Sequence, residues 1–280
     1  MKRILSVLLA CICILITGCQ VDIDSTDNSS LDENLDKTEY DIESGVYTSS
    51  KVDIIRNFSN KNENVTSSTD SKKKIYLTFD DGPSANTDKI LDILDKYNIK
   101  ATFFVLGKTG EFASRAYKRI VDEGHSLGMH SFSHKYSEVY ATKESFINDV
   151  TRLQEYLYEE TGVWSRLYRF PGGSSNKVSK VPMDELIDYL NEQGIRYFDW
   201  NVSADDAVSG GLSKEKIVSN CLGTIDKYDE CVILMHDALD KKSTLNALEE
   251  IIIRLNQRGD SEFLPITDDT IPVQHVNKSK

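Results

Sequence analysis

Residues 74–83 read Lys-Ile-Tyr-Leu-Thr-Phe-Asp-Asp-Gly-Pro, a run of strand-forming residues that ends in two aspartates and a turn. A helical pattern follows over Thr87–Tyr97, where apolar residues recur at the spacing of one helix face. The order strand, turn, helix is the unit from which parallel sheets are built, because a crossover must return the chain before the next parallel strand can start. This stretch therefore predicts an α/β fold.

The same unit recurs along the rest of the chain. Strands are predicted over 74–79, 101–106, 125–130, 167–170, 195–200 and 231–236, and helices over 87–97, 111–123, 143–160, 184–192, 213–227 and 244–255. A last strand is expected near 263–266. Six repeats with crossover helices predict parallel strands arranged either as a doubly wound sheet or as a barrel.

The composition excludes several classes of protein. Hydrophobic residues make up 39% and charged residues 28% of the 280 positions, as in soluble globular proteins. The net charge of −12 repels a phosphate backbone, so no nucleic-acid partner is expected. Five cysteines are too few for a disulfide scaffold, and no apolar run after residue 20 is long enough to cross a bilayer.

The N-terminus combines a secretion signal with a lipidation motif. Lys2 and Arg3 precede an apolar run over 4–16, which is shorter than the ~20 residues of a membrane span. The following Ile16-Thr-Gly-Cys19 resembles the lipobox of bacterial lipoproteins, which implies removal of residues 1–18 and a lipid on Cys19. The alternative is an ordinary signal peptide followed by an unrelated cysteine. We expect the lipid to anchor the protein on the extracytoplasmic face of the bacterial cell membrane.

Residues 19–73 are expected to form the lipidated N-terminus and a flexible tether. More than half of positions 20–73 are Ser, Thr, Asn or Asp, and no apolar periodicity persists. The remaining residues, 74–280, are predicted to form one catalytic domain, whose length suffices to bury a full core.

Charged and imidazole side chains follow several of the predicted strands, where parallel sheets and barrels place their chemistry. Asp80 and Asp81 follow the first strand, and adjacent carboxylates repel each other unless a cation or an arginine lies nearby. His130 and His134 have the i, i+4 spacing that lets two imidazoles share one metal ion. Two histidines with one carboxylate leave open positions on the metal, as in catalytic zinc or Fe(II) sites.

Five short motifs carry a resemblance to a known family. They are Thr78-Phe-Asp-Asp-Gly82, His130-Ser-Phe-Ser-His134, Arg169-Phe-Pro-Gly172, Asp199-Trp200 with Asp205-Asp206, and Leu234-Met-His236. Their order and spacing resemble those of the NodB-homology polysaccharide deacetylases, carbohydrate esterase family four, over Lys74–Pro265. The resemblance implies a distorted (β/α) barrel of about seven parallel strands and metal-dependent hydrolysis of N-acetyl groups on a polysaccharide.

The resemblance assigns Asp81, His130 and His134 to one divalent metal ion, usually zinc. Such an ion polarises the amide carbonyl and lowers the pKa of bound water from 15.7 towards ~7. Asp80 is implied as the general base, and the backbone N–H of Gly172 as a donor to the tetrahedral oxyanion.

The resemblance also implies an acid and two residues that support the acid–base pair. His236 would protonate the leaving amine, and Asp206 would raise the pKa of His236. Arg169 would pair with Asp80 and hold it ionised. Asp206 is chosen over Asp205 because the family places this aspartate six positions after the tryptophan, here Trp200.

Trp200 and Leu234 are expected to form the walls of a small pocket for the acetyl methyl group, although such residues more often belong to a core. Ala207 departs from the family, in which many members have a tryptophan after the motif-four aspartate. This departure leaves the sugar-stacking surface, and with it the preferred glycan, open.

The expected substrate is N-acetylglucosamine in peptidoglycan, because an exoprotein held at the membrane meets the cell wall first. Deacetylation of muramic acid residues, of a secreted N-acetylglucosamine polymer or of xylan is an alternative with the same chemistry. Two further alternatives are a catalytically silent glycan-binding lipoprotein and an Fe(II) oxygenase. Cys221 and Cys231 are read either as a disulfide or as two buried thiols.

Overall fold

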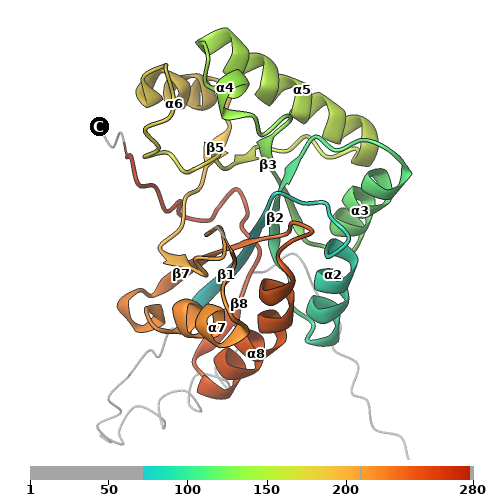
Figure 1. Ribbon diagram of the computed structural model, residues 1–280, viewed down its shortest axis with the longest axis vertical. Coiled ribbons are helices and arrows are strands. Elements are labelled where there is room, and N and C mark those ends of the chain that lie inside the picture. Colours follow the sequence, from blue (N-terminus) through green and yellow to red (C-terminus); the bar gives the residue numbers. More distant parts are fainter. Residues whose placement is uncertain (1–71, 209, 278–280) are drawn as a thin grey trace, which may run out of the picture. The chain divides into compact units, whose positions relative to one another are not determined.

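The computed structural model of the protein describes residues 72–208 and 210–277 (Figure 1). The predicted signal peptide 1–18, the lipidation site Cys19 and the tether up to residue 71 lie outside these residues. Lys73, expected at the end of the tether, is the first residue of strand β1. Within the described residues, we find no helix that is both long and apolar enough to cross a membrane.

The described residues alternate between strands and helices as the sequence predicts. The strands are β1 (Lys73–Asp80), β2 (Thr102–Leu106), β3 (Ser126–Ser131), β4 (Leu167–Tyr168), β5 (Arg196–Tyr197), β6 (Val202–Ser203), β7 (Glu230–His236) and β8 (Ser261–Phe263). The helices are α2 (Thr87–Lys96), α3 (Glu111–Asp122), α4 (Tyr136–Val139), α5 (Lys143–Thr161), α6 (Met183–Glu192), α7 (Lys214–Leu222), the 3₁₀ helix η1 (Ile225–Lys227) and α8 (Lys242–Arg258). Only α4 and β6 were not predicted, and the predicted helix 213–227 is divided into α7 and η1.

The sheet is a curled one, which decides between the two predicted architectures. Its strands are all parallel and run in the order β5-β4-β3-β2-β1-β7-β6. Strands β5 and β6 lie at opposite ends of this order, yet only residues 198–201 connect them. A flat sheet of seven strands would separate its edges by about 29 Å, whereas so short a connection spans at most about 18 Å. The two edges must therefore approach each other, as in the expected distorted barrel of about seven parallel strands.

Strand β8 pairs with β1 and does not extend the edge of the sheet. Along one side β1 pairs with β7 over its whole length, and along the other it pairs with β8 near its start and with β2 near its end. The chain after β8 then runs beside β4 and β5, where the Asp199 N–H donates to the Val273 carbonyl at 2.7 Å. This C-terminal segment, residues 264–277, covers the side on which β5 and β6 form no ladder.

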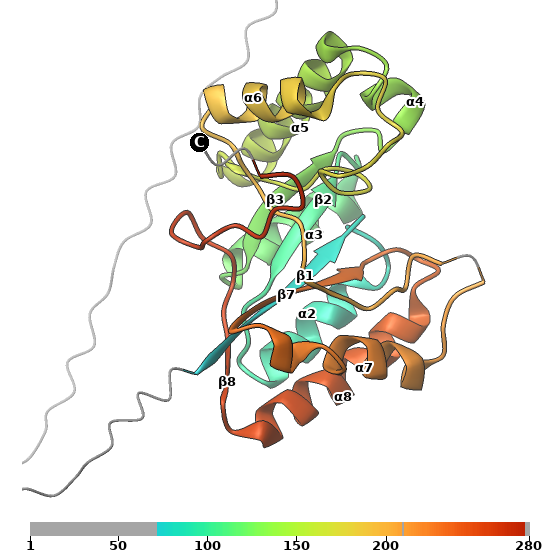
Figure 2. The same cartoon turned by 90° about the vertical axis from the view of Figure 1, so that its left-hand side faces the viewer.

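The helices lie around the outside of the curled sheet (Figure 1). Helices α4, α5 and α6 lie over the β3–β5 end, and α7 and α8 over the β7–β6 end (Figure 2). In α5 the apolar stripe predicted from the sequence, Phe146, Val150, Leu153 and Leu157, is fully buried. The helix begins at a side-chain cap from Thr142 and ends at Gly162, which has the left-handed conformation that favours glycine.

Both cysteines among the described residues, Cys221 and Cys231, are buried and unpaired. Burial raises the pKa of the Cys231 thiol to about 11, and it raises that of Cys221 further. The thiols are therefore protonated and unreactive, which agrees with the second of the two predicted readings.

Candidate active site

Three side chains able to hold a metal converge at the C-terminal ends of β1 and β3. Asp81 follows β1, His130 belongs to β3, and His134 lies four residues further on. The Asp81 Oδ1 atom lies 3.7 Å from His130 Nε2 and 3.3 Å from His134 Nε2. The structure thus brings together the three residues that the resemblance assigns to the metal.

The donor atoms of this set fit a divalent cation. Asp81 Oδ1 is buried and has no hydrogen-bond partner among the described residues, which is costly unless a cation compensates the carboxylate. His130 donates from Nδ1 to the Arg169 carbonyl at 2.7 Å, so its Nε2 lone pair faces Asp81. Burial, followed by the proximity of His130, lowers the pKa of His134 and favours its neutral form. Two imidazole nitrogens and one carboxylate oxygen are donors that zinc accepts.

The turn that carries His134 is held by Asp149 of α5. Asp149 Oδ1 accepts from the Ser131 hydroxyl at 2.8 Å and from the Phe132 N–H at 2.9 Å, and Oδ2 accepts from the Ser133 N–H at 3.1 Å. The Ser131 hydroxyl in turn accepts from the His134 N–H at 2.9 Å. His134 has a φ of 55°, an unfavourable conformation for a residue with a Cβ. These hydrogen bonds compensate the strain and fix the direction of the imidazole.

The turn that carries Asp81 is supported in a similar way. Asp81 has a φ of 73°, and the Lys108 ammonium donates to its carbonyl at 2.8 Å. The buried Asp237 carboxylate lies against the same turn, where a Cβ added to Gly82 would be 2.6 Å from Asp237 Oδ2. Gly82 is therefore required for this close approach. Burial raises the pKa of Asp237, although the Ser84 hydroxyl donates to it at 2.6 Å.

Asp80 is oriented by Arg169, which is completely buried. The Arg169 Nη1 group donates to Asp80 Oδ1 at 2.9 Å and to the Thr78 hydroxyl at 2.7 Å. The other donors of the guanidinium reach the carbonyls of Phe198 and Asp199, each at 3.0 Å. Because Oδ1 is bound to Arg169, the free Oδ2 atom of Asp80 is the one that faces His130 Nε2, at 3.9 Å.

His236, the last residue of β7, is paired with Asp206 and not with Asp205. Asp206 Oδ1 accepts from His236 Nδ1 at 2.7 Å, and Oδ2 accepts from the His236 N–H at 2.9 Å and from the Thr244 hydroxyl at 2.7 Å. Burial by itself would lower the pKa of His236, but the hydrogen bond and the charge of Asp206 outweigh it and raise this pKa. Asp205 is exposed.

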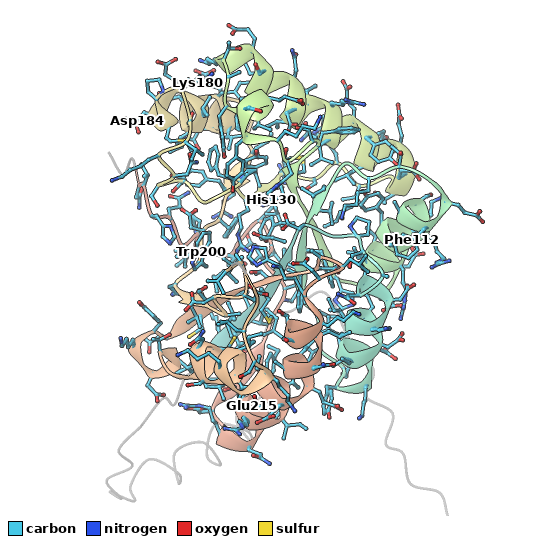
Figure 3. The ribbon with its side chains drawn as sticks, in the orientation of Figure 1. Phe112, His130, Lys180, Asp184, Trp200 and Glu215 are labelled. Carbon is cyan, nitrogen blue, oxygen red and sulfur yellow. The ribbon has the colours of Figure 1, made fainter. Side chains whose placement is uncertain are left out.

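These groups line one cleft of about 770 Å³, and its residues His130 and Trp200 lie in the middle of the described part of the chain (Figure 3). The cleft is lined by the acidic and imidazole groups Asp80, Asp81, His130, His134, Asp206 and His236, and by the expected pocket residues Gly172, Trp200 and Leu234. Ala207 and Val208 also line it. Leu234 is 7% exposed, so its side chain is largely part of the core and presents little surface to the cleft.

The sequence did not reveal several residues that shape the cleft. Tyr136 lines it from α4, while Lys108 and Asp149 hold the two ligand-bearing turns from behind. Their signal in the sequence is weak, because each acts on a segment distant in the chain. The strand-end Asp199 has a supporting role, since its carboxylate accepts from the Ser174 N–H at 2.8 Å and from the His275 N–H at 2.7 Å.

A known protein family also matches part of this chain. The family model described as polysaccharide deacetylase matches residues 67–198. The matched range contains Asp80, Asp81, His130, His134 and Arg169, and it stops before Asp206 and His236. The structure nevertheless shows the pairing of Asp206 with His236 that the motifs led us to expect.

Individual relatives extend the match beyond this range. YheN of Bacillus subtilis is 33% identical over 207 residues, which cover 72% of this chain and 70% of that protein. The peptidoglycan-N-acetylglucosamine deacetylase PgdA of Listeria monocytogenes is 31% identical over 201 residues, which cover 71% of this chain but only 39% of PgdA. This chain therefore matches about two fifths of the length of that relative.

Solved structures show the same fold. The catalytic domain of peptidoglycan N-acetylglucosamine deacetylase from Eubacterium rectale is 39% identical, with a TM-score of 0.69 over 73% of this chain and 93% of that one. A carbohydrate esterase of the CE4 class from Streptococcus mutans is 32% identical, with a TM-score of 0.63 over 71% and 87%. With a matching family model, a shared fold and identities above 30% over about 70% of the chain, the chain belongs to the polysaccharide deacetylase family.

Proposed function

We propose that this enzyme removes the acetyl group from N-acetylglucosamine residues of cell-wall peptidoglycan, with one zinc ion held by Asp81, His130 and His134. The observation that carries the proposal is the arrangement of the cleft. The same cleft holds a ligand set for a divalent cation, a carboxylate fixed by an arginine, and an imidazole fixed by a carboxylate.

The zinc ion would act as a Lewis acid on the amide carbonyl and would make water more acidic. Asp80 then takes a proton from the attacking water through its free Oδ2 atom, since Oδ1 is occupied by Arg169. Arg169 holds the Oδ1 atom of the carboxylate and restricts its rotation. The Gly172 N–H donates to the oxygen on which negative charge develops as the tetrahedral carbon forms.

His236 supplies the second proton, to the nitrogen that leaves. An amine leaves an amide carbon only when its nitrogen is protonated, so the reaction requires an acid near neutral pH. Asp206 favours the imidazolium form of His236 and holds its Nδ1, which leaves Nε2 as the proton donor. Base and acid are thus in opposite protonation states before the reaction starts.

The choice of glycan rests on the relatives and on the N-terminus. Both the PgdA protein and the Eubacterium rectale structure are named for peptidoglycan N-acetylglucosamine. The lipobox-like sequence ending at Cys19 would place the enzyme on the extracytoplasmic face of the membrane, with residues 19–73 as a tether to the wall. We therefore propose a lipid-anchored enzyme that acts on the nearest N-acetylated polymer.

The test of the substrate is acetate release from purified peptidoglycan, chitin oligomers and acetylated xylan, each with and without a chelator. We expect release from peptidoglycan that the chelator abolishes and added zinc restores. Asp80→Asn should keep its metal and lose about 10²–10⁴-fold in rate. Release from xylan alone would contradict the proposed substrate, and release that a chelator leaves unchanged would contradict the metal.

The anchor is tested separately by detergent-phase partitioning of the full-length protein and of Cys19→Ala expressed in a bacterial host. The wild type should partition into detergent and the variant into the aqueous phase. Equal aqueous partitioning of both proteins would exclude lipid attachment at Cys19.

A further inference from the structure

Tyr136 is the one tyrosine among the described residues that line the cleft. It begins the short helix α4, two residues after His134, and its ring centroid lies 5.5 Å from that of the His134 imidazole. The residue is 37% exposed, because one side packs on His134 and the other faces the cleft. Tyr136 therefore contacts the proposed ligand His134 as part of the cleft wall and not as part of the hydrophobic core.

The Tyr136 hydroxyl lies over Gly172, on the loop that follows β4. A Cβ added to Gly172 would be 3.2 Å from Tyr136 Oη, closer than most atoms approach a real Cβ. The lack of a side chain at Gly172 thus leaves the space that the hydroxyl occupies. The hydroxyl is in this way brought beside the residue whose backbone N–H we assign to the oxyanion.

A second tyrosine, one turn later, fixes this arrangement. Tyr140 is buried, and its hydroxyl donates to the Pro171 carbonyl at 2.9 Å, directly before Gly172. This bond joins the end of α4 to the Pro171–Gly172 loop, so the two cannot move apart independently. The ring centroids of Tyr136 and Tyr140 lie 5.9 Å apart, and Tyr136 shares the same support.

The two hydroxyls differ in one respect. That of Tyr140 is satisfied by the protein, whereas that of Tyr136 has no hydrogen-bond partner within the described residues. A phenol hydroxyl is both a donor and an acceptor of hydrogen bonds. An unused donor on a supported side chain at the wall of a cleft is available to a ligand.

We infer that Tyr136 is a substrate-binding residue, whose hydroxyl donates a hydrogen bond to an oxygen of the bound glycan beside Gly172. That oxygen is either the acyl oxygen or the nearest sugar hydroxyl, both of which accept such a bond. The inference rests on the proposed deacetylase function and adds to it a contact that none of the five motifs contains.

The test is Tyr136→Phe, which removes the hydroxyl and keeps the ring against His134. Tyr158→Phe is the matched control, since Tyr158 is 51% exposed on α5 and does not line the cleft. Both variants and the wild type are compared on N-acetylglucosamine oligomers and on an aryl acetate ester, which has an acyl oxygen but no sugar. Metal content and circular dichroism are measured on all three proteins.

We expect kcat/KM of Tyr136→Phe on the oligomers to fall about tenfold or more, with unchanged metal content and fold. A parallel loss on the aryl acetate identifies the acyl oxygen as the acceptor, and a loss on the oligomers alone identifies a sugar hydroxyl. Tyr158→Phe should match the wild type on both substrates.

The inference is overturned if Tyr136→Phe stays within about twofold of the wild type on both substrates. It is also overturned if the loss is accompanied by loss of metal, because the hydroxyl would then support the ligand set and not the substrate. Failure of the proposed function gives a different result, in which the wild type itself releases no acetate from the oligomers.

Discussion

Asp205 and Asp206 are neighbours in the chain, but only Asp206 contacts His236. In Asp206→Asn the imidazolium form of His236 loses its partner charge, so the pKa of this proposed acid falls. We expect the alkaline limb of the kcat/KM profile to move to lower pH by about one unit or more. Asp205→Asn should leave that limb in place, because Asp205 is exposed. A shift in Asp205→Asn without one in Asp206→Asn would show that Asp205, and not Asp206, raises the pKa of His236.

His125 makes the stability of the fold sensitive to acid. The ring is buried, its Nδ1 accepts from the Ala101 N–H at 3.1 Å, and its Nε2 lies 3.8 Å from Glu123 Oε2. Burial, followed by the charges of Lys100 and Arg119, lowers its pKa from 6.5 to about 4. The unfolded chain therefore binds a proton below pH 6.5 that the folded chain binds only near pH 4, and the free energy of unfolding falls as the pH falls through this interval.

Between pH 7 and pH 5 this residue should cost about 2 kcal/mol of stability. The variant His125→Asn keeps an acceptor for the Ala101 N–H and does not titrate in this range. Urea denaturation at both pH values should show a smaller loss for His125→Asn than for the wild type. Equal losses in the two proteins would mean that His125 takes up its proton without unfolding.

At the scale of the elements, α5 supports the metal site from a distance through Asp149. In Asp149→Ala the N–H groups of Phe132 and Ser133 lose their acceptor, and the turn that holds His134 at a positive φ loses its support. We expect a fall of about 10- to 100-fold in zinc affinity, the usual effect of removing an outer-shell partner.

The matched control is Glu155→Ala, an exposed acid on the same helix. Zinc affinity by competition with a chromophoric chelator is the measurement, and circular dichroism reports the fold. If Asp149→Ala binds zinc as tightly as Glu155→Ala, the turn keeps its conformation without Asp149.

Long elements could be predicted from the sequence, and short ones could not. The stripe of α5 extends over more than three turns and gives a clear period, whereas α4 has four residues and β6 has two. Elements this short show no hydrophobic periodicity in the sequence from which they could be predicted. The proposed ligand residues could be found because each lies within a short motif, whereas Tyr136 and Asp149 gain their roles only when their helices pack against other segments of the chain.

The sequence also could not distinguish a doubly wound sheet from a barrel, because the architecture depends on contacts between distant segments. Local patterns give the strands and their parallel sense, but not which strands are neighbours. The short connection between β5 and β6 excludes a flat sheet, but this conclusion can be drawn only once the order of the strands is known.

At the scale of the whole molecule, the C-terminal segment 264–277 supports Trp200, a residue that lines the cleft, through His275. A chain that ends at Thr267 would lose the bonds of His275 to Asp199 and to the Trp200 carbonyl and that of Val276 to Ser174. Because Asp199 is buried, we expect the free energy of unfolding to fall by about 3 kcal/mol or more. Activity should fall as well, since Trp200 lines the cleft.

A point variant on the same segment provides the control. Ile271 is 72% exposed, so Ile271→Ser should unfold at the same urea concentration as the wild type. If the truncated chain also unfolds at that concentration, the segment is not part of the cooperative unit.

The fluorescence of the chain's two tryptophans can also be used to observe the cleft. Trp200 lies at the wall of the cleft with His275 4.8 Å from its ring, whereas Trp164 is 52% exposed and packs on Tyr158. Indole emission depends on the polarity of the surroundings and is quenched by a neighbouring imidazolium. Trp164→Phe would leave a single emitter at the cleft, so entry of a glycan or departure of the C-terminal segment could be followed by the intrinsic fluorescence of the unlabelled enzyme.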